Sequence, residues 1–235
     1  MRNTEAALDG LAGPLEIFFR DDDAGWGNRE LFRLLDLFGK FDMPLDLAAI
    51  PAAIDRETAN ELMRQLEHCP WLGLHQHGYC HVNHEPEGTR KCEFGTARSQ
   101  QRQIADIVAG RERLRDLTGA PDPIFTPPWN RCGPHLLEAL PAHGFALFSA
   151  DRRIEDQGAA IAQLPVSFDW ERAMREDRLD EALGKAISTA EHPFGIMLHH
   201  AVMDDASHDR LATLLGHLAS NTRVVVRKMK HWIPQ

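Results

Sequence analysis

Short apolar runs alternate with segments of helical periodicity along the whole sequence, and this alternation limits the fold more than any other feature. The first run, LEIFF at residues 15–19, is rich in aromatic and branched side chains, which is typical of a buried strand. Strands separated mostly by helices favour parallel pairing through crossover helices, and therefore an α/β fold. Further strands are predicted at residues 45–50, 71–75, 123–125, 145–149, 164–168, 194–198 and 223–227.

The segments between these runs predict helices. Asn28 is expected to cap a helix that carries Leu31, Leu35 and Phe38 on one side, and a long helix is expected over residues 99–117. The usual nucleotide-binding signatures of open sheets are absent, because no G-x-G-x-x-G follows the first predicted strand and the sequence has no Walker motif. We therefore predict a distorted TIM-like (β/α) barrel with about seven strands, formed by a single domain over residues 1–235.

Composition and charge exclude several classes of protein. With 235 residues, of which 43% are hydrophobic, the chain is long enough to bury a substantial core. The 35 acidic residues exceed the 26 basic ones and no Lys/Arg-rich run interrupts the formal net charge of -9, so nucleic acid is not an expected partner. The opening MRNTEAALDG lacks the apolar region of a signal peptide, and no apolar run approaches membrane-spanning length. We expect a cytoplasmic protein without a membrane partner, whose 4 cysteines are free thiols.

Polar clusters follow four of the predicted strands. In barrels of parallel strands the reactive side chains collect on loops at the carboxyl ends of the strands, so we expect these clusters on one face. Each cluster also has a purely structural interpretation, such as a carboxylate that caps a helix or a Pro-Pro-Trp turn that buries its indole. The clusters are DDD at residues 21–23, HQHGYCH at 75–81, TPPWN at 126–130 and HH at 199–200.

The histidine-rich stretch HQHGYCHVNH is the most informative of these clusters. His77 and His81 stand four residues apart, a spacing that allows two imidazoles to converge on one metal ion. Gly78 occupies the position where the H-E-x-x-H motif requires glutamate, so the motif is a different one. A bare H-x-x-x-H is weak in a chain with 13 histidines, but the carboxylates expected on the same face would supply a third ligand. His75 and His84 are expected to have structural or substrate-contact roles.

Taken together, the four clusters resemble the motifs of the polysaccharide deacetylases with the NodB homology domain, grouped as carbohydrate esterase family 4. The pattern of that family is an Asp-Asp pair after the first strand, H-[ST]-x-x-H, an R-x-P-[YW] loop, an Asp-containing motif and a late L-x-H. The present sequence has RDDDAG, HGYCH, TPPW and MLHH in the same order, and they span most of the chain. The order of the motifs is far more specific than any one of them.

The resemblance implies a catalytic base and a metal site. Asp22 corresponds to the base, and Asp23 corresponds to the carboxylate ligand of a divalent metal ion, for which zinc is expected. His77 and His81 would complete a site with two histidines, one carboxylate and open positions for water and substrate. The pair formed by Asp21 and Asp22 is the alternative registration. The later pair is preferred because Ala-Gly follows it, as glycine follows the pair in the family.

The late histidines and the TPPWN cluster supply the remaining roles that the resemblance implies. His199 corresponds to the general acid that protonates the departing amine, and His200 is the alternative because LHH also satisfies L-x-H. Trp129, Asn130 and His200 are expected to contact substrate. A backbone N–H near Trp129 is expected to stabilise the oxyanion. Trp26 and Trp129 are either core residues or an apolar wall for a sugar ring or an acyl group.

The sequence departs from the family pattern at three places. Thr126 replaces the arginine that orients the catalytic base, and Arg20 and Arg131 are the candidates to substitute for it. Glycine replaces the Ser/Thr of the metal motif, which removes a side chain but no ligand. The aspartate that supports the catalytic histidine is either Asp151 or Asp169.

The implied reaction is removal of an acyl group, with acetyl expected, from an amide nitrogen of a sugar or another small substrate. Because the sequence lacks a signal peptide, we expect a soluble amino sugar, a glycan precursor or another small amide rather than an exported polymer. The alternative is a catalytically silent, deacetylase-like protein that binds a metal ion or a glycan. Its main support is the missing family arginine.

Overall fold

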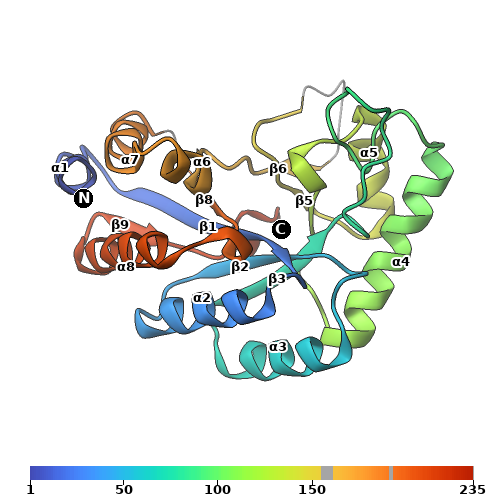
Figure 1. Ribbon diagram of the computed structural model, residues 1–235, viewed down its shortest axis with the longest axis horizontal. Coiled ribbons are helices and arrows are strands. Elements are labelled where there is room, and N and C mark those ends of the chain that lie inside the picture. Colours follow the sequence, from blue (N-terminus) through green and yellow to red (C-terminus); the bar gives the residue numbers. More distant parts are fainter. Residues whose placement is uncertain (155–160, 191–192, 235) are drawn as a thin grey trace.

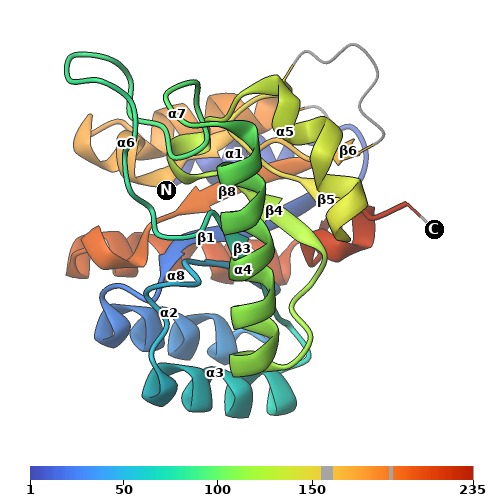
Figure 2. The same ribbon diagram turned by 90° about the vertical axis from the view of Figure 1, so that its right-hand side faces the viewer.

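The computed structural model describes residues 1–154, 161–190 and 193–234. A sheet of parallel strands forms its centre, and helices cover the outer face of this sheet (Figures 1 and 2). The order across the sheet is β6-β5-β4-β3-β2-β1-β8-β7, and β9 pairs with the beginning of β1. The strands are β1 (Leu15–Ala24), β2 (Leu45–Ala49), β3 (Leu72–His77), β4 (Ile124–Thr126), β5 (Leu147–Phe148), β6 (Ala162–Gln163), β7 (Phe168–Asp169), β8 (Phe194–Leu198) and β9 (Val224–Val226).

The sheet is curled like a barrel, and its two ends are linked by the segment between β6 and β7. At one end of that segment, the Leu164 N–H donates a hydrogen bond to the Phe148 carbonyl of β5. At the other end, the Ser167 N–H donates to the Gly195 carbonyl of β8. The predicted α/β, barrel-like fold is therefore confirmed. The described part of the chain has nine strands rather than about seven, because a two-residue strand such as β6 has no apolar run to reveal it.

Helices connect most of the strands, as the periodicity predicts. None of the described α-helices is long and apolar enough to cross a lipid bilayer. The helices, including the short 3-10 helices η1 to η4, are α1 (Arg2–Asp9), α2 (Asn28–Lys40), α3 (Arg56–His68), α4 (Gln100–Thr118), η1 (Pro128–Asn130), α5 (Pro134–Ala139), η2 (Leu140–His143), α6 (Trp170–Arg175), α7 (Leu179–Ser188), η3 (His200–Val202), α8 (Asp205–Ser220) and η4 (Met229–Trp232).

Helix beginnings show one correct prediction and one error. The long helix predicted at residues 99–117 is α4, and the Ser99 side chain caps it by accepting the Arg102 N–H. The prediction that Asn28 caps α2 is wrong, because the residue before the helix is Gly27 in the left-handed conformation. The Asn28 amide instead donates to the Thr58 hydroxyl of α3 at 2.7 Å. The Asn28 side chain, which the local sequence pattern assigned to the helix cap, therefore forms a tertiary hydrogen bond instead.

Apolar clusters pack against both faces of the sheet. On the outer face, β1 residues such as Phe19 pack with buried leucines of α2 and α8. On the inner face, Phe18 packs with Met197 of β8 and Met229 of η4, which fills the inside of the curl. Gly195 permits this packing, because a Cβ there would lie 2.2 Å from the Phe18 ring. The interior is closed by side chains, so the chemistry is left to the rim.

At the rim, two strands extend further than predicted. The first strand was expected to end at residue 19, but β1 continues to Ala24 and carries the three aspartates on its carboxyl end. The third was expected to end at residue 75, but β3 continues to His77. Charged and polar residues have low strand propensity, so the pattern alone ends each strand too early. Pairing holds this end of β1 in the sheet, as far as Asp21 on the side of β8 and Ala24 on the side of β2.

Candidate active site

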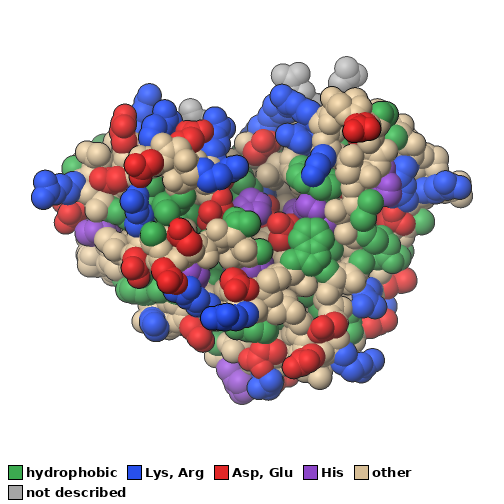
Figure 3. Space-filling model, viewed as in Figure 1, with side chains coloured by type: hydrophobic (Ala, Val, Ile, Leu, Met, Phe, Trp, Pro, Cys, Tyr) green, Lys and Arg blue, Asp and Glu red, His purple; other side chains and the backbone are tan. Residues whose placement is uncertain are grey.

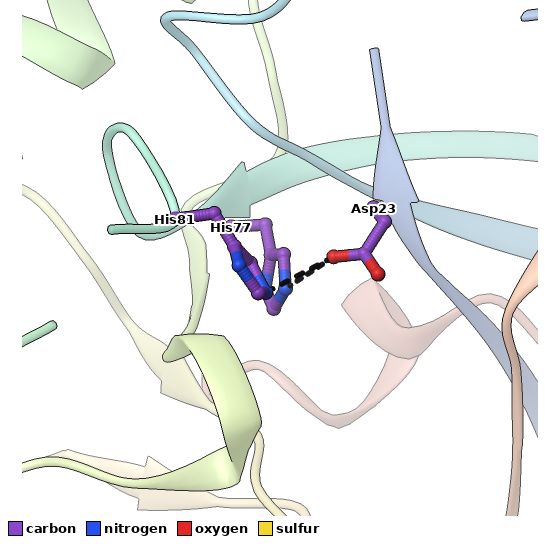
Figure 4. A group of neighbouring side chains, drawn as sticks. All are labelled: Asp23, His77 and His81. Atoms are coloured by element: carbon purple, nitrogen blue, oxygen red, sulfur yellow. Dashed lines mark ion pairs between the residues drawn. The ribbon is translucent and has the colours of Figure 1, made fainter. Parts of the chain in front are cut away.

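Three of the predicted residues converge at the carboxyl end of the sheet. Asp23 Oδ1 lies 3.3 Å from His77 Nε2 and 3.2 Å from His81 Nε2 (Figure 4). One possible ligand atom from each residue lies within 4.8 Å of the others. Asp23 belongs to β1, His77 is the last residue of β3, and His81 follows in the next turn. The fold therefore brings together a carboxylate and two imidazoles that are more than fifty residues apart in the chain.

A bulge in β1 directs the Asp23 side chain toward these histidines. Asp21 pairs with Leu47 of β2, whereas Ala24 pairs with Ala49, so β1 holds one more residue than its partner over this interval. Asp23 is in the left-handed region with a φ of 71°. Non-glycine residues seldom adopt this conformation, and it is commonly retained where a site requires it. Here it changes the alternation of side chains so that Asp23 points into the site.

The arrangement fits a divalent metal ion. Asp23 Oδ1 is buried and has no hydrogen-bond partner among the described residues, although two imidazole nitrogens lie close to it. His77 Nδ1 lies 3.1 Å from the Thr126 carbonyl, which can only accept a hydrogen bond, so Nε2 is the nitrogen that faces Asp23 and could bind a metal ion. Two imidazoles and one carboxylate form a donor set that suits zinc and related ions.

A buried glutamate holds the turn that carries His81. Glu93 Oε1 accepts the Cys80 N–H at 2.7 Å, and Oε2 accepts the Tyr79 N–H at 3.2 Å. Gly78, with a φ of 57°, leaves room for this carboxylate, because a Cβ there would lie 2.3 Å from Glu93 Oε2 and 2.5 Å from Pro128 Cγ. The departure from Ser/Thr in the metal motif thus has a structural reason. The sequence indicates only a loop here and does not identify Glu93.

Gly78→Ala is expected to weaken zinc binding by about tenfold to a hundredfold, as changes to groups that orient metal ligands do. The added Cβ would displace Glu93 and therefore the turn that positions His81. Zinc affinity is measured by competition with a chromophoric chelator. Gly88→Ala is the matched control, because Gly88 also has a positive φ but no atom lies within 4 Å of its Cβ position. Equal zinc affinity in Gly78→Ala and the wild type would contradict the role of this turn.

Asp22 lies beside the three converging residues and is paired with a buried arginine. Arg20 Nε lies 2.8 Å from Asp22 Oδ1, and Nη2 lies 2.9 Å from Oδ2. Burial alone would raise the pKa of the Asp22 carboxyl, but the charges of Arg20 and nearby histidines hold this pKa below its usual value. Arg20 also donates to Ser149 Oγ at 2.8 Å and to Asn130 Oδ1 at 2.7 Å. Of the two arginines considered as substitutes, Arg20 is the one that contacts Asp22.

The residue at the position of the family arginine has a different function. The Thr126 hydroxyl lies 2.9 Å from His75 Nε2, and both side chains are fully buried. Burial and the charge of Arg20 lower the pKa of His75 to about 3, so this imidazole is neutral. The expectation that His75 is a buried hydrogen-bonding residue agrees with these contacts.

Asp21 and His200 form a separate buried pair. Asp21 Oδ2 lies 2.6 Å from His200 Nδ1, and Oδ1 accepts the His200 N–H at 2.9 Å. His200 Nε2 lies 2.7 Å from the Trp26 carbonyl, so both ring nitrogens face acceptors. Burial would lower the pKa of His200, but the Asp21 carboxylate raises it to about 9. Both ring nitrogens of the buried His200 thus face acceptors of the protein itself, and the substrate contact expected for this residue remains a prediction.

The remaining predicted residues line one cavity of about 560 Å³. His199, Trp129 and Asn130 are among its lining residues, and so are both candidates for the supporting aspartate, Asp151 and Asp169. The Asp169 carboxylate accepts the Arg172 N–H at the beginning of α6, so this group is partly committed to capping. His199 therefore lines the cavity, whereas its neighbour His200 is buried.

The two tryptophans considered as an apolar wall enclose one of the converging histidines. The His81 ring centroid lies 4.9 Å from that of Trp26 and 4.3 Å from that of Trp129. Trp26 remains 42% exposed, which is unusual for a large aromatic side chain. His81, Trp129 and Asn130 all have positive φ angles near 55°. The site therefore concentrates backbone conformations that non-glycine residues adopt only under constraint.

Comparison with known proteins identifies the fold. No protein-family model and no curated protein matches the sequence. Among solved structures, a family 4 acetyl xylan esterase from Clostridium thermocellum, in complex with a cobalt ion, superimposes with a TM-score of 0.65 at 15% identity. The match covers 92% of this chain and 89% of the esterase. The chain has the fold of the carbohydrate esterase family 4 deacetylases.

This deacetylase fold occurs in proteins with different activities. A family 4 pseudoenzyme from Bacillus anthracis has a TM-score of 0.60 at 12% identity, and the match covers 95% of this chain and 66% of the pseudoenzyme. A 4-alpha-glucanotransferase from Thermococcus litoralis has a TM-score of 0.62 at 11% identity, over 93% of this chain and 40% of that protein. The fold alone therefore does not decide the activity, and the side chains of the site have to be considered.

Proposed function

We propose that this protein is a metal-dependent hydrolase that removes an acyl group, with acetyl expected, from an amide nitrogen of a sugar or another small substrate. The observation that carries this proposal is the convergence of Asp23, His77 and His81 beside Asp22. Asp23, His77 and His81 would hold the ion, and zinc suits their donor atoms. When bound, the ion supplies Lewis-acid activation of the substrate carbonyl and of water.

The neighbouring side chains would manage the protons of this reaction. Asp22 is ionised at neutral pH and is held in a fixed orientation by Arg20, which makes it suitable to accept a proton from the attacking water. His199 lines the cavity next to the site and is suited to donate a proton to the departing amine. The Trp129 N–H is the candidate donor to the oxyanion.

A catalytically silent binding protein is the second candidate function. It is favoured by the replacement of the family arginine by Thr126, and by the occurrence of the fold in a family 4 pseudoenzyme. The ion pair between Arg20 and Asp22 argues against it, because the base has an arginine partner from a different position in the chain. We therefore favour the active hydrolase.

Acetate release from N-acetylglucosamine and other small acetamides distinguishes the two functions. The zinc-loaded protein is expected to release acetate, and removal of the metal by a chelator is expected to abolish this release until zinc is added back. Acetate is measured by an enzyme-coupled assay, and zinc content is measured by elemental analysis. Stoichiometric zinc together with sugar binding, but without hydrolysis of any acetamide, would support the silent binding protein instead.

A further inference from the structure

Three arginines line the cavity that contains His199. Arg131 follows η1 on one side of this cavity, and Arg172 and Arg175 lie on α6 on the other. Figure 3 shows a notch between two parts of the surface, with histidine side chains near its floor and Lys/Arg side chains on both walls. The chain as a whole has a formal net charge of -9, so such a concentration of cations is not a general property of its surface.

Two of these guanidinium groups form no ion pair with any carboxylate of the described residues. Arg131 donates a hydrogen bond to the Lys91 carbonyl at 3.3 Å, and Arg175 donates one to the Glu171 carbonyl at 3.4 Å. Within residues 1–154, 161–190 and 193–234, no salt bridge includes either arginine. Arg172 does pair with Glu176, at 3.2 Å on the exposed side of α6.

The acidic residues of the cavity do not offset this charge fully. The Asp169 carboxylate caps α6 by accepting the Arg172 N–H at 3.0 Å. Asp151 is exposed near the beginning of the loop that follows β5. Three arginines therefore line a cavity with two aspartates, one of which is already used in a helix cap, and Arg131 and Arg175 are the two arginines without an ion pair. A ligand with an anionic group would find donors on both walls.

The position of the cavity relative to the proposed chemistry indicates which half of the substrate it receives. His199 lines this cavity and, in the proposed function, donates a proton to the departing nitrogen. The part of the substrate that carries this nitrogen therefore lies in the same cavity. Its volume of about 560 Å³ is in the range of sites that take small molecules such as a monosaccharide.

We infer that the amine half of the substrate carries a carboxylate or phosphate group, which binds between Arg131 on one wall and Arg175 on the other. This inference rests on the proposed function and names the class of substrate for it. Guanidinium groups donate paired hydrogen bonds to both kinds of oxyanion, and such charge-assisted bonds are stronger than those between neutral groups. A neutral amino sugar would leave these donors to water.

Kinetics with matched substrates test the inference. The zinc-loaded full chain is assayed with N-acetylglucosamine, N-acetylglucosamine 6-phosphate and N-acetylmuramic acid, which are neutral, phosphorylated and carboxylated. The kcat/KM is expected to be at least about tenfold higher for one of the anionic substrates, and which one is preferred distinguishes phosphate from carboxylate. Equal kcat/KM for all three, or a preference for the neutral sugar, would overturn the inference.

Variants show whether the cavity arginines cause the preference. Arg131→Met and Arg175→Met are each expected to raise the KM for the anionic substrate about tenfold more than they raise the KM for the neutral sugar. Arg178→Met is the control, because Arg178 is exposed, pairs with Glu176 and does not line this cavity. If both cavity variants keep the preference for the anionic substrate, other residues must cause that preference, and the inference would be overturned.

Product binding separates failure of this inference from failure of the proposed function. Calorimetry compares glucosamine with glucosamine 6-phosphate on the zinc-loaded protein, and it requires no turnover. Tighter binding of the phosphate, reduced in Arg131→Met and Arg175→Met, would support the anionic site even in a protein that hydrolyses no amide. Hydrolysis of neutral amides without any preference for anionic ligands would retain the proposed function and overturn the inference.

Discussion

Asp22→Asn is expected to lower kcat for amide hydrolysis by about a hundredfold to ten-thousandfold while the protein retains its zinc. The reason is that Asp22 accepts a proton in the proposed reaction, whereas Asp23, His77 and His81 hold the ion. An amide cannot accept the proton, but it removes no ligand. The two measurements are kcat with the best substrate and zinc content by elemental analysis, both on the same preparation.

Asp22→Asn is also expected to lower the stability of the folded protein. Asp22 is buried in an ion pair with Arg20, and the loss of one charge from a buried pair destabilises proteins by about 3 kcal/mol or more. Arg20 keeps its hydrogen bonds to Ser149 and Asn130, so the variant is expected to fold with a lower midpoint of thermal unfolding. Circular dichroism at the assay temperature verifies that the loss of rate occurs in folded protein.

Asp21→Asn provides the comparison for Asp22→Asn. Asp21 contacts His200 and not the converging histidines, so its substitution is expected to reduce stability more than the intrinsic rate of the folded fraction. The registration of the carboxylate pair would be wrong by one residue if Asp21→Asn were inactive with its zinc retained while Asp22→Asn lost its zinc.

His77→Ala and Asp23→Ala are each expected to abolish stoichiometric zinc binding. Either change removes one of three protein ligands, and a zinc site with two protein ligands is too weak to survive purification. Zinc per chain is measured after dialysis against metal-free buffer, and the expected value falls from about one to near zero. Amide hydrolysis is expected to be lost with the metal.

His84→Ala is the matched control for the metal ligands. His84 lies in the same histidine-rich stretch but outside the converging group. Its substitution is expected to leave one zinc per chain in place. Retention of stoichiometric zinc by both His77→Ala and Asp23→Ala would exclude the proposed ligand set.

The sequence alone predicted the α/β barrel-like fold and the residues that converge in the site. Alternating apolar runs and helical periodicity were sufficient for the fold, because parallel strands joined by helices allow few arrangements. The converging residues were also accessible, because each lies in a short motif at the end of a predicted strand. Parallel strands place such ends at one rim, so the DDD cluster and the histidines were expected to meet there, and the family resemblance selected Asp23 from the three aspartates.

Only the tertiary structure decided which groups support these residues. Arg20 lies on the same strand as Asp22, yet its choice over Arg131 depends on where Ser149 and Asn130 lie in the fold. Glu93 reaches the turn of the metal motif from a loop whose sequence shows no periodicity.

The pairing of Asp21 with His200 joins residues that are 179 positions apart in the chain. Local pattern reports backbone propensity and spacing, but side-chain partners across the sheet are fixed by the bulge in β1 and by packing, which no short stretch of sequence encodes.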